Sequence, residues 1–214
     1  ASNIQKKEPQ LFSSGINLRS AYRAMAAMDT ASSGGLICAA PTGASCGVIA
    51  SVLYTLHHDF KFDMNKIIKC ALAAGVIGLI NGMNSTFAAE IAGCQVEIGM
   101  AGAMAAAAVI EAANGSPAAA TEAAAIALQN TMGSVCDLVA GFCEIPCHTR
   151  NAVAASNAFI CADLIIGGYA NPISLDDSIQ ASFESGKMLP PQLRCTSLGG
   201  IAITESAKKL GLNK

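Results

Sequence analysis

Charged and aromatic residues are scarce in this sequence of 214 residues, and this scarcity excludes several classes of partner. Only 13% of the residues are charged, 5% are aromatic and none is tryptophan, whereas 52% are hydrophobic. The net charge is −2, and lysine and arginine are not clustered. Binding to nucleic acid or to an anionic membrane surface requires such a cluster, so neither partner is expected. A surface this poor in charge instead indicates that another protein chain covers part of it.

Signals for membrane insertion and secretion are weak. The 20 residues 70–89 carry no charge until position 90, and this is about the length that spans a bilayer. They include three glycines and two asparagines, and neither tryptophan belts nor basic flanks accompany them. The first residues lack the basic-then-apolar order of a signal peptide. We therefore expect a soluble cytoplasmic protein in which this stretch forms a buried helix and a loop, with a membrane-spanning helix as the minor alternative.

Helical patterns recur along the chain, whereas strand patterns are short and few. They predict an all-α fold in which residues 1–214 form one compact domain of about seven to nine helices, with corners marked by Gly and Pro. Helix caps are predicted at Asn17, Asp63, Ser116 and Ser174, and a helix end at Asn114. Residues 81–92 are ambiguous and 133–146 irregular. The expected helices cover 18–28, 48–58, 64–79, 94–114, 117–130, 148–167, 174–186 and 204–210.

The chain contains nine cysteines, and their odd number argues against a framework of disulfides. The chain is also not a small secreted domain, so thiolates in an intracellular protein are expected. Cys94, Cys136 and Cys147 stand in contexts marked by Gly or Pro and are 42 and 11 residues apart. Cys94 and Cys147 fall at expected helix starts, where thiolates are stabilised. Cys70 and Cys161 lie in mid-helix among apolar residues, and a packing role is expected for both.

Metal binding by the three marked cysteines competes with the simpler interpretation that they only pack in the core, since no Cys-x-x-Cys pair occurs. Structural zinc usually takes four protein ligands. Three thiolates instead suit a [4Fe–4S] cluster with one open iron, which can bind and polarise substrate oxygens. Cys46 and Cys143 are candidates for an additional ligand, although packing is the simpler role for each.

Two other segments contain residues suited to binding. Arg150 is the candidate for a substrate carboxylate, because a guanidinium binds carboxylates through two hydrogen bonds. An ordinary ion pair at a helix start is its alternative role. His148 directly follows Cys147, so it lies beside the cluster if one is bound and is otherwise a surface residue. The Gly-rich turn 41–47 could hold an anion through its N–H groups, but it lacks the end of a P-loop.

Five segments, taken together in this order and spacing, resemble one family: 40–47, 93–99, 136–141, 146–152 and 198–204. They resemble the α subunit, or catalytic α domain, of the iron–sulfur-dependent bacterial L-serine dehydratases, over about residues 18–210. The resemblance implies an all-helical catalytic domain with an oxygen-sensitive [4Fe–4S] cluster on Cys94, Cys136 and Cys147. It implies conversion of L-serine to pyruvate and ammonia without pyridoxal phosphate. The residues that we expect in the catalytic site are Thr42, Ser45, Asn84, His148, Arg150 and Asn151.

The resemblance implies that the open iron binds the carboxylate and the 3-hydroxyl group of serine. It also implies a base that takes the α-proton, and the sequence does not identify this base. One departure concerns the substrate. The family usually has Lys-Asn-Ala-Ser before the first cluster cysteine, where this chain has Met83, Asn84, Ser85 and Thr86. Another small amino or hydroxy acid, such as L-cysteine or L-threonine, is therefore an alternative to serine.

A second departure concerns the assembly. The small β half of the family is absent from this sequence. The chain is therefore expected to be a subunit, or an excised domain, that works with a β subunit or β domain in an oligomer. A non-catalytic helical subunit that supports another chain is the remaining alternative.

Overall fold

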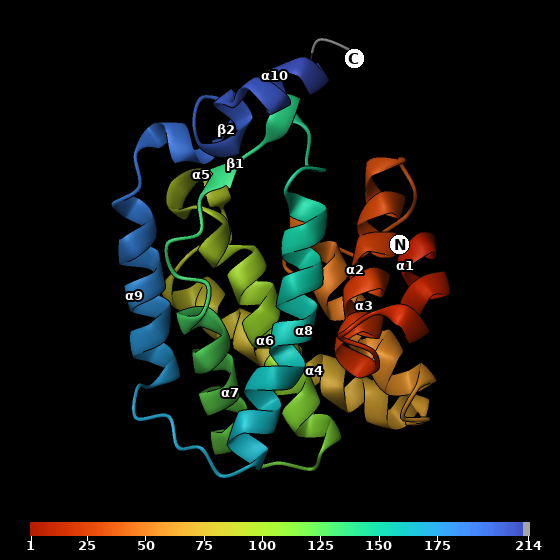
Figure 1. The fold of residues 1–214 in the computed structure, drawn as a ribbon. Coiled ribbons are helices and arrows are strands. Elements are labelled where there is room, and N and C mark those ends of the chain that lie inside the picture. Colours follow the sequence, from red (N-terminus) through yellow and green to blue (C-terminus); the bar gives the residue numbers. More distant parts are fainter. Residues whose placement is uncertain (212–214) are drawn as a thin grey trace.

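The computed structural model describes residues 1–211, and helices form nearly all of its regular structure (Figure 1). The predicted all-α fold is confirmed. Two of the ten α-helices in this range are only six and four residues long, and these were not expected. The helices are α1 (Ser2–Lys7), α2 (Ile16–Ser32), α3 (Cys46–His58), α4 (Met64–Asn84), α5 (Ala89–Ala92), α6 (Ile98–Ala112), α7 (Pro117–Gln129), α8 (Cys147–Ile166), α9 (Leu175–Lys187) and α10 (Glu205–Gly211).

Helix α6 is the centre of the fold, and α3, α4, α7 and α8 pack against it (Figure 1). Of its 15 residues, all except Glu111 are buried. Nine of the 15 are Ala or Gly, and such small side chains let neighbouring helices approach closely. The start of α6 directly follows Cys94 and Glu97, so this enclosed helix determines where those two residues lie.

Helix α4 packs one face against α6 and exposes the other. This helix and the run Cys94–Ala112 are each long and apolar enough to cross a membrane. The second run is 94% buried within the fold and is a core helix, whereas 33% of the apolar window in α4 is buried. The expectation that residues 70–89 contain a buried helix is thus correct for only one face of α4. The outward face carries large apolar side chains that are more than half exposed, namely Met64, Ile68, Leu72, Val76, Leu79 and Met83.

Three of the four predicted helix caps are confirmed. Asp63, Ser116 and Ser174 each accept a hydrogen bond from the backbone N–H three residues further on. The prediction for Asn17 was wrong, because α2 already begins at Ile16. The residue before it is a glycine with a φ of +95°, so the backbone itself turns the chain into the helix and no side chain caps it.

The region expected to be irregular contains β1 (Cys136–Asp137), which pairs in parallel with β2 (Arg194–Thr196). Cys136 pairs with the first residue of β2 and Asp137 with the last, so Cys195 is an extra residue between the two partners. Its φ is +59°, a left-handed conformation that is uncommon for a side chain of this type. The pair was not predicted, because strands of two or three residues show no alternating pattern and their partners are far apart in the sequence.

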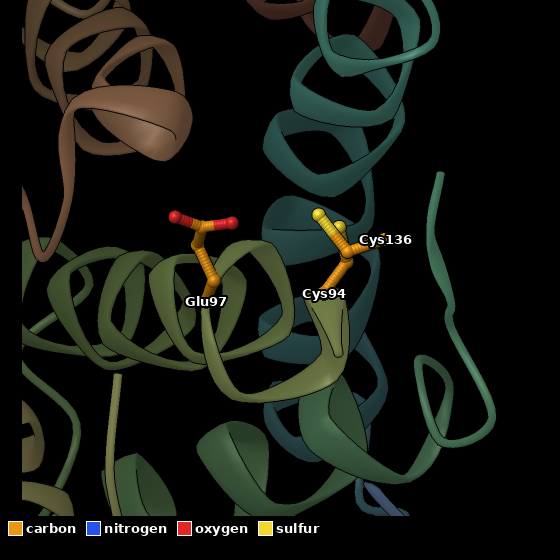
Figure 2. Close-up of side chains that lie close together, drawn as sticks. All are labelled: Cys94, Glu97 and Cys136. Atoms are coloured by element: carbon orange, nitrogen blue, oxygen red, sulfur yellow. The ribbon is translucent and has the colours of Figure 1, made fainter. Parts of the chain in front are cut away.

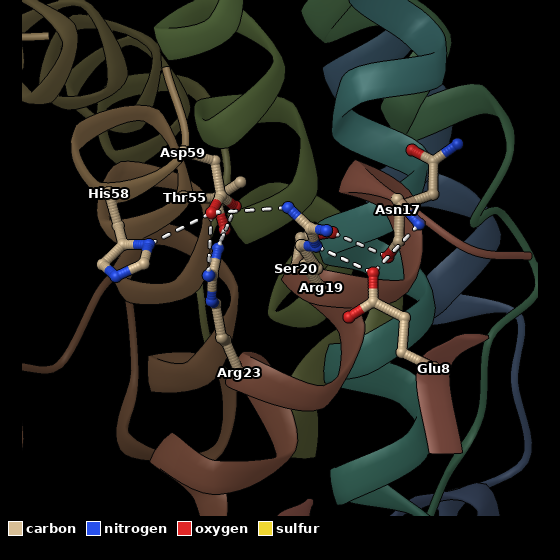
Figure 3. A network of polar contacts seen from close by, with 9 residues as sticks. Glu8, Asn17, Arg19, Ser20, Arg23, Thr55, His58 and Asp59 are labelled. Atoms are coloured by element: carbon tan, nitrogen blue, oxygen red, sulfur yellow. Dashed lines mark hydrogen bonds and ion pairs between the residues drawn. The ribbon is translucent and has the colours of Figure 1, made fainter. Parts of the chain in front are cut away.

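A polar network ties the N-terminal segment to α2 and α3 (Figure 3). The guanidinium of Arg23 donates to the Asp59 carboxylate and to Thr55 Oγ1, and Arg19 Nε donates to Glu8 Oε1 at 2.8 Å. The hydrogen bond from Arg23 lowers the pKa of Asp59 from 3.8 to about 2, although burial opposes this shift. None of these residues belongs to the predicted catalytic site, so we assign the network to the stability of the fold.

Candidate metal centre

Gly93 and Cys94 form a tight corner before α6. The φ of Gly93 is +73°, and a Cβ at this position would lie 2.6 Å from the carbonyl oxygen of Ser134. Only glycine fits both conditions. The close approach lets the N–H of Cys94 donate to that same carbonyl at 3.0 Å. Cys94 then begins a 3-10 turn, η3 (Cys94–Val96), that leads into α6, so its predicted place at a helix start is confirmed.

Gln95 joins this corner to the segment that carries Cys136. It is fully buried, and its Oε1 accepts a hydrogen bond from the N–H of Gly133 at 2.8 Å. Together with the bond between Cys94 and Ser134, this bond holds the chain before β1 against η3. The sulfur atoms of Cys94 and Cys136, which are 42 residues apart in the sequence, thereby lie within 4.8 Å of each other.

Cys94, Glu97 and Cys136 form a compact buried group (Figure 2). Their two sulfur atoms and one carboxylate oxygen lie within 4.8 Å of one another. The residues are 1%, 8% and 2% exposed, and all three functional groups extend to the same side of the turn that begins α6 (Figure 2). The adjacent Cys94 sulfur and burial both raise the pKa of the Cys136 thiol, because two thiolates this close repel each other in a dry environment.

Cys147 is the first residue of α8, as predicted, and is buried. It lies outside the compact group, in a neighbouring apolar cluster around Met28. The adjacent Cys143 thiol and burial raise the pKa of Cys147, and Glu97 acts in the same direction. Glu97 also raises the pKa of Cys136. One carboxylate therefore acts on the thiols of both clusters.

Three more cysteines lie near these thiols. Cys143 is the neighbour of the α8 thiol just described. Cys46 donates its S–H to the sulfur of Met28 at 3.6 Å. Cys195 was not among the predicted residues. Strand β2 places it beside Cys136, and burial and this neighbour raise the pKa of Cys195 to about 12. Nothing in the sequence indicated this contact, because it depends on the pairing of the two short strands.

Thr42 and Ser45 reach the compact group through Glu97. The hydroxyl of Thr42 donates to Glu97 Oε1 at 2.6 Å. Ser45 Oγ accepts from the N–H of Thr42 at 3.3 Å, and the two hydroxyl oxygens are 3.0 Å apart. Burial raises the pKa of Glu97, and the bond from Thr42 offsets part of that rise. Glu97 was missing from the predicted site, although it is the single acidic residue between positions 91 and 110 and follows Cys94 by three residues.

Arg150 binds groups of the protein itself. Its Nη1 donates to the carbonyl of Val135 at 2.8 Å and to Cys94 Sγ at 3.7 Å, and its Nη2 donates to Asp137 Oδ1 at 2.9 Å. The other carboxylate oxygen of Asp137 accepts from the N–H of Ile201. Arg150 thus forms the ion pair considered as its alternative role, and it positions β1. It also lines, with Cys94, a cavity of about 320 Å³.

Asn151 and His148 face different neighbours although both belong to the first turns of α8. Asn151 is fully buried, and its Nδ2 donates to the carbonyl of Ala44 at 2.8 Å, which holds the Gly-rich turn against α8. The ring of His148 contacts α2, with Nε2 3.1 Å from Ser32 Oγ and Nδ1 3.3 Å from Asp29 Oδ1. Asn151 therefore supports the frame of the site, whereas His148 joins two helices.

Asn84 ends α4 and is exposed, and its Nδ2 donates to the carbonyl of Ile80 in its own helix at 2.8 Å. Met83, the residue that departs from the family pattern, is 77% exposed. Within residues 1–211, no hydrogen bond or ion pair joins the side chain of Asn84 or His148 to the compact group. Of the six predicted catalytic residues, the structure brings Thr42, Ser45 and Arg150 to that group.

The donor set fits a metal group that is bound by thiolates. Neighbouring buried thiols resist deprotonation because of burial and mutual repulsion, and a bound metal cation reverses this preference. None of the nine cysteines is in a disulfide. The hydrogen bond from Arg150 to the Cys94 sulfur is the kind of outer contact that orients a metal ligand. Two of the three predicted ligands lie side by side, and Cys147 lies in the adjoining cluster.

Comparison with known proteins places this arrangement in one family. The pattern of the family "Serine dehydratase alpha chain" matches residues 2–202. The chain is 39% identical over 188 residues to a probable L-serine dehydratase, alpha chain, of Bacillus subtilis (strain 168). The aligned region covers 88% of this chain and 63% of the Bacillus protein. The chain is 38% identical to the protein of the same description from Latilactobacillus sakei, covering 88% and 90% of the two chains.

A third relative is longer. The chain is 40% identical over 183 residues to the L-serine dehydratase TdcG of Escherichia coli (strain K12), covering 84% of this chain and 40% of that protein. The chain thus spans about two fifths to nine tenths of the length of these relatives. The family match over residues 2–202 includes Thr42, Cys94, Glu97, Cys136 and Arg150. This chain belongs to the serine dehydratase alpha chain family.

Proposed function

We propose that this chain is the α subunit of an L-serine ammonia-lyase, which converts L-serine to pyruvate and ammonia with a [4Fe–4S] cluster and without pyridoxal phosphate. The observation that carries the proposal is the buried pair of Cys94 and Cys136 beside Glu97, at the centre of a chain from the serine dehydratase alpha chain family. Cys147, at the start of α8, is the third ligand of this proposal. Relatives named L-serine dehydratase support the reaction and its substrate.

The proposed reaction needs no net oxidation. Loss of the α-proton and of the 3-hydroxyl group removes one molecule of water from serine and leaves 2-aminoacrylate. Its imine tautomer takes up water and releases ammonia, which yields pyruvate. When bound, the cluster supplies a Lewis acid for the carboxylate and hydroxyl oxygens of the substrate, so that hydroxide leaves more easily.

The side chains of this chain prepare the site in three ways. Arg150 donates to the Cys94 sulfur and fixes β1 through Asp137, so it orients two candidate ligands at once. The burial of the thiols keeps bulk water away from the reacting groups, which strengthens every electrostatic interaction there. The Thr42 hydroxyl fixes the carboxylate of Glu97 at the edge of the thiol group.

We further propose that the enzyme is a soluble cytoplasmic protein that works with a β chain in an oligomer. The description of two relatives as an alpha chain supports a second kind of chain. The low content of charge and the large exposed apolar side chains are what a surface covered by another chain requires.

The test is to purify the chain without oxygen, alone and with a β chain, and to measure iron, sulfide and turnover. About four iron and four sulfide per chain are expected for one [4Fe–4S] cluster. The enzyme should form pyruvate faster from L-serine than from L-cysteine. It should also form pyruvate from L-serine faster than it forms 2-oxobutyrate from L-threonine. A chain that takes up no iron would contradict the cluster. A loaded enzyme that prefers L-cysteine or L-threonine would assign it a different substrate, and a loaded but inactive complex would leave the non-catalytic subunit as the better interpretation.

A further inference from the structure

Glu97 is a buried carboxylate that has no cationic partner in the part of the chain that the structure describes. It is 8% exposed, and within residues 1–211 its carboxylate accepts one hydrogen bond, from the hydroxyl of Thr42 to Oε1 at 2.6 Å. No lysine, arginine or histidine within residues 1–211 forms an ion pair with it. A carboxylate removed from water is costly unless it is paired, so an unpaired one in a candidate site indicates a positively charged ligand.

The groups around Glu97 also favour a bound cation. Its ligand oxygen lies within 4.8 Å of the sulfur atoms of Cys94 and Cys136. Thiolates at these positions would place further negative charge around the carboxylate. The guanidinium of Arg150, which donates to the Cys94 sulfur, is already bound to Asp137 and to the main chain.

The second oxygen of Glu97 is available for a ligand. Thr42 occupies Oε1, and no residue between 1 and 211 donates a hydrogen bond to Oε2. Thr42 itself is held by Ser45, since the N–H of Thr42 donates to Ser45 Oγ and the two hydroxyls are 3.0 Å apart. The carboxylate is thus fixed in one orientation before a ligand arrives, which lowers the entropic cost of binding. In Figure 2 it extends to the same side as the two sulfur atoms.

We propose that Glu97, oriented by Thr42, binds the α-ammonium group of the substrate and thereby makes the site specific for amino acids over hydroxy acids. This inference rests on the proposed function and assigns one subsite of it. The ammonium group offers three N–H donors and a positive charge, which match the free carboxylate oxygen and the negative surroundings. A hydroxy acid of the same shape has a neutral hydroxyl in that place, so it leaves the carboxylate unpaired.

The experiment compares L-serine with L-glycerate, which carries a hydroxyl in place of the ammonium group. Each compound is titrated into the iron-loaded complex, and binding is followed by the absorption and electron paramagnetic resonance spectra of the cluster. The wild-type protein should bind L-serine more tightly than L-glycerate. In Glu97→Gln, which keeps the shape and removes the charge, serine should bind about ten- to a hundredfold more weakly. Glycerate should bind within about threefold of its wild-type affinity, and iron and sulfide contents should not change.

Thr42→Val serves as a second variant that leaves the carboxylate in place and removes the hydroxyl that orients it. It should weaken serine binding in the same direction but by a smaller factor, and it carries the test if Glu97→Gln does not fold. Loss of iron from Glu97→Gln would make Glu97 a metal ligand and overturn the inference. Equal weakening of serine and glycerate, or no weakening of serine, would overturn it as well. A wild-type complex that neither binds serine nor forms pyruvate would contradict the proposed function itself.

Discussion

Arg150, which is half-buried, and the buried Asp137 form an ion pair that joins the start of α8 to the strand of Cys136, with 2.9 Å between Nη2 and Oδ1. Asp137 is 1% exposed, and its second oxygen accepts from the N–H of Ile201 near the C-terminal end of the described chain. One carboxylate thus connects three segments. Removal of its charge leaves a half-buried guanidinium without its counter-ion, which is more costly than the loss of an exposed pair.

Asp137→Asn should therefore lower the free energy of unfolding by about 1–3 kcal/mol, measured by urea denaturation of the cofactor-free chain. Glu205→Gln is the control, because Glu205 pairs with Lys208 on the exposed side of α10. That change should stay within about 0.5 kcal/mol of the wild type. Similar losses from the two variants would show that the pair of Arg150 and Asp137 contributes no more to stability than an exposed pair.

The proposed cluster ligands can be separated from packing cysteines by one matched series. Cys94→Ala, Cys136→Ala and Cys147→Ala should each reduce bound iron to a small fraction of the wild-type value, because a thiolate ligand is lost. Cys70→Ala is the control: Cys70 is fully buried in α4 and does not belong to the compact group. It should retain its iron. Full iron in Cys147→Ala would remove the α8 cysteine from the ligand set.

Substitution of glycine by alanine is expected to have opposite effects on stability at Gly186 and at Gly75. A Cβ on Gly186 in α9 would lie 2.1 Å from the carbonyl oxygen of Ala92 and 2.6 Å from Gln95 Nε2, so α9 packs directly on the chain before α6. Gly186→Ala should lower the free energy of unfolding by about 1–3 kcal/mol. A Cβ on Gly75, in the exposed middle of α4, meets nothing within 4 Å.

Gly75→Ala should accordingly raise the free energy of unfolding by about 0.5–1 kcal/mol, because alanine favours the helix and glycine does not. Thermal denaturation of both variants is the measurement. A midpoint for Gly186→Ala at or above that of the wild type would mean that α9 can move away from the site without cost.

The network around Asp59 predicts a loss of stability in acid. The bond from Arg23 lowers the pKa of Asp59 from 3.8 to about 2 in the folded chain. A carboxyl group with a depressed folded pKa stabilises the fold fully above its unfolded pKa, and this contribution disappears as the pH falls through the folded value. The cofactor-free chain should therefore lose stability between about pH 4 and pH 2.

The measurement is the urea midpoint of the wild type and of Asp59→Asn at pH 5, 3 and 2. The two proteins should differ most at pH 5, and the difference should shrink towards pH 2 as the wild-type carboxylate takes up its proton. A difference that stays constant across this range would show that Asp59 acts by packing and not through its charge.

The sequence could predict the features that depend on neighbouring residues. The caps at Asp63, Ser116 and Ser174 were predictable because each side chain binds a backbone group three residues away. The helix end at Asn114 was predictable for a similar reason, since asparagine tolerates the φ of +59° that it adopts there. Gly93 marked a corner in the same way.

The features that depend on contacts between residues far apart in the chain could not be predicted from the sequence. The role of Glu97 depends on Thr42, which precedes it by 55 residues. The place of Cys195 depends on a parallel pair of strands with no pattern of its own. The ion pair between Arg150 and Asp137 also depends on where the fold places β1, and the role of Arg150 towards a substrate stays a prediction.

The pairing of β1 with β2 also sets an order of events during synthesis. The ribosome makes the chain from its N-terminal end, so α2 to α8 can pack while β2 is still to be made. Until then Cys136 lies on an unpaired strand, and Asp137 lacks the N–H of Ile201. The complete group of thiols therefore forms only when nearly all of the described chain has emerged. The proposed metal group is therefore expected to bind only after β2 has been made.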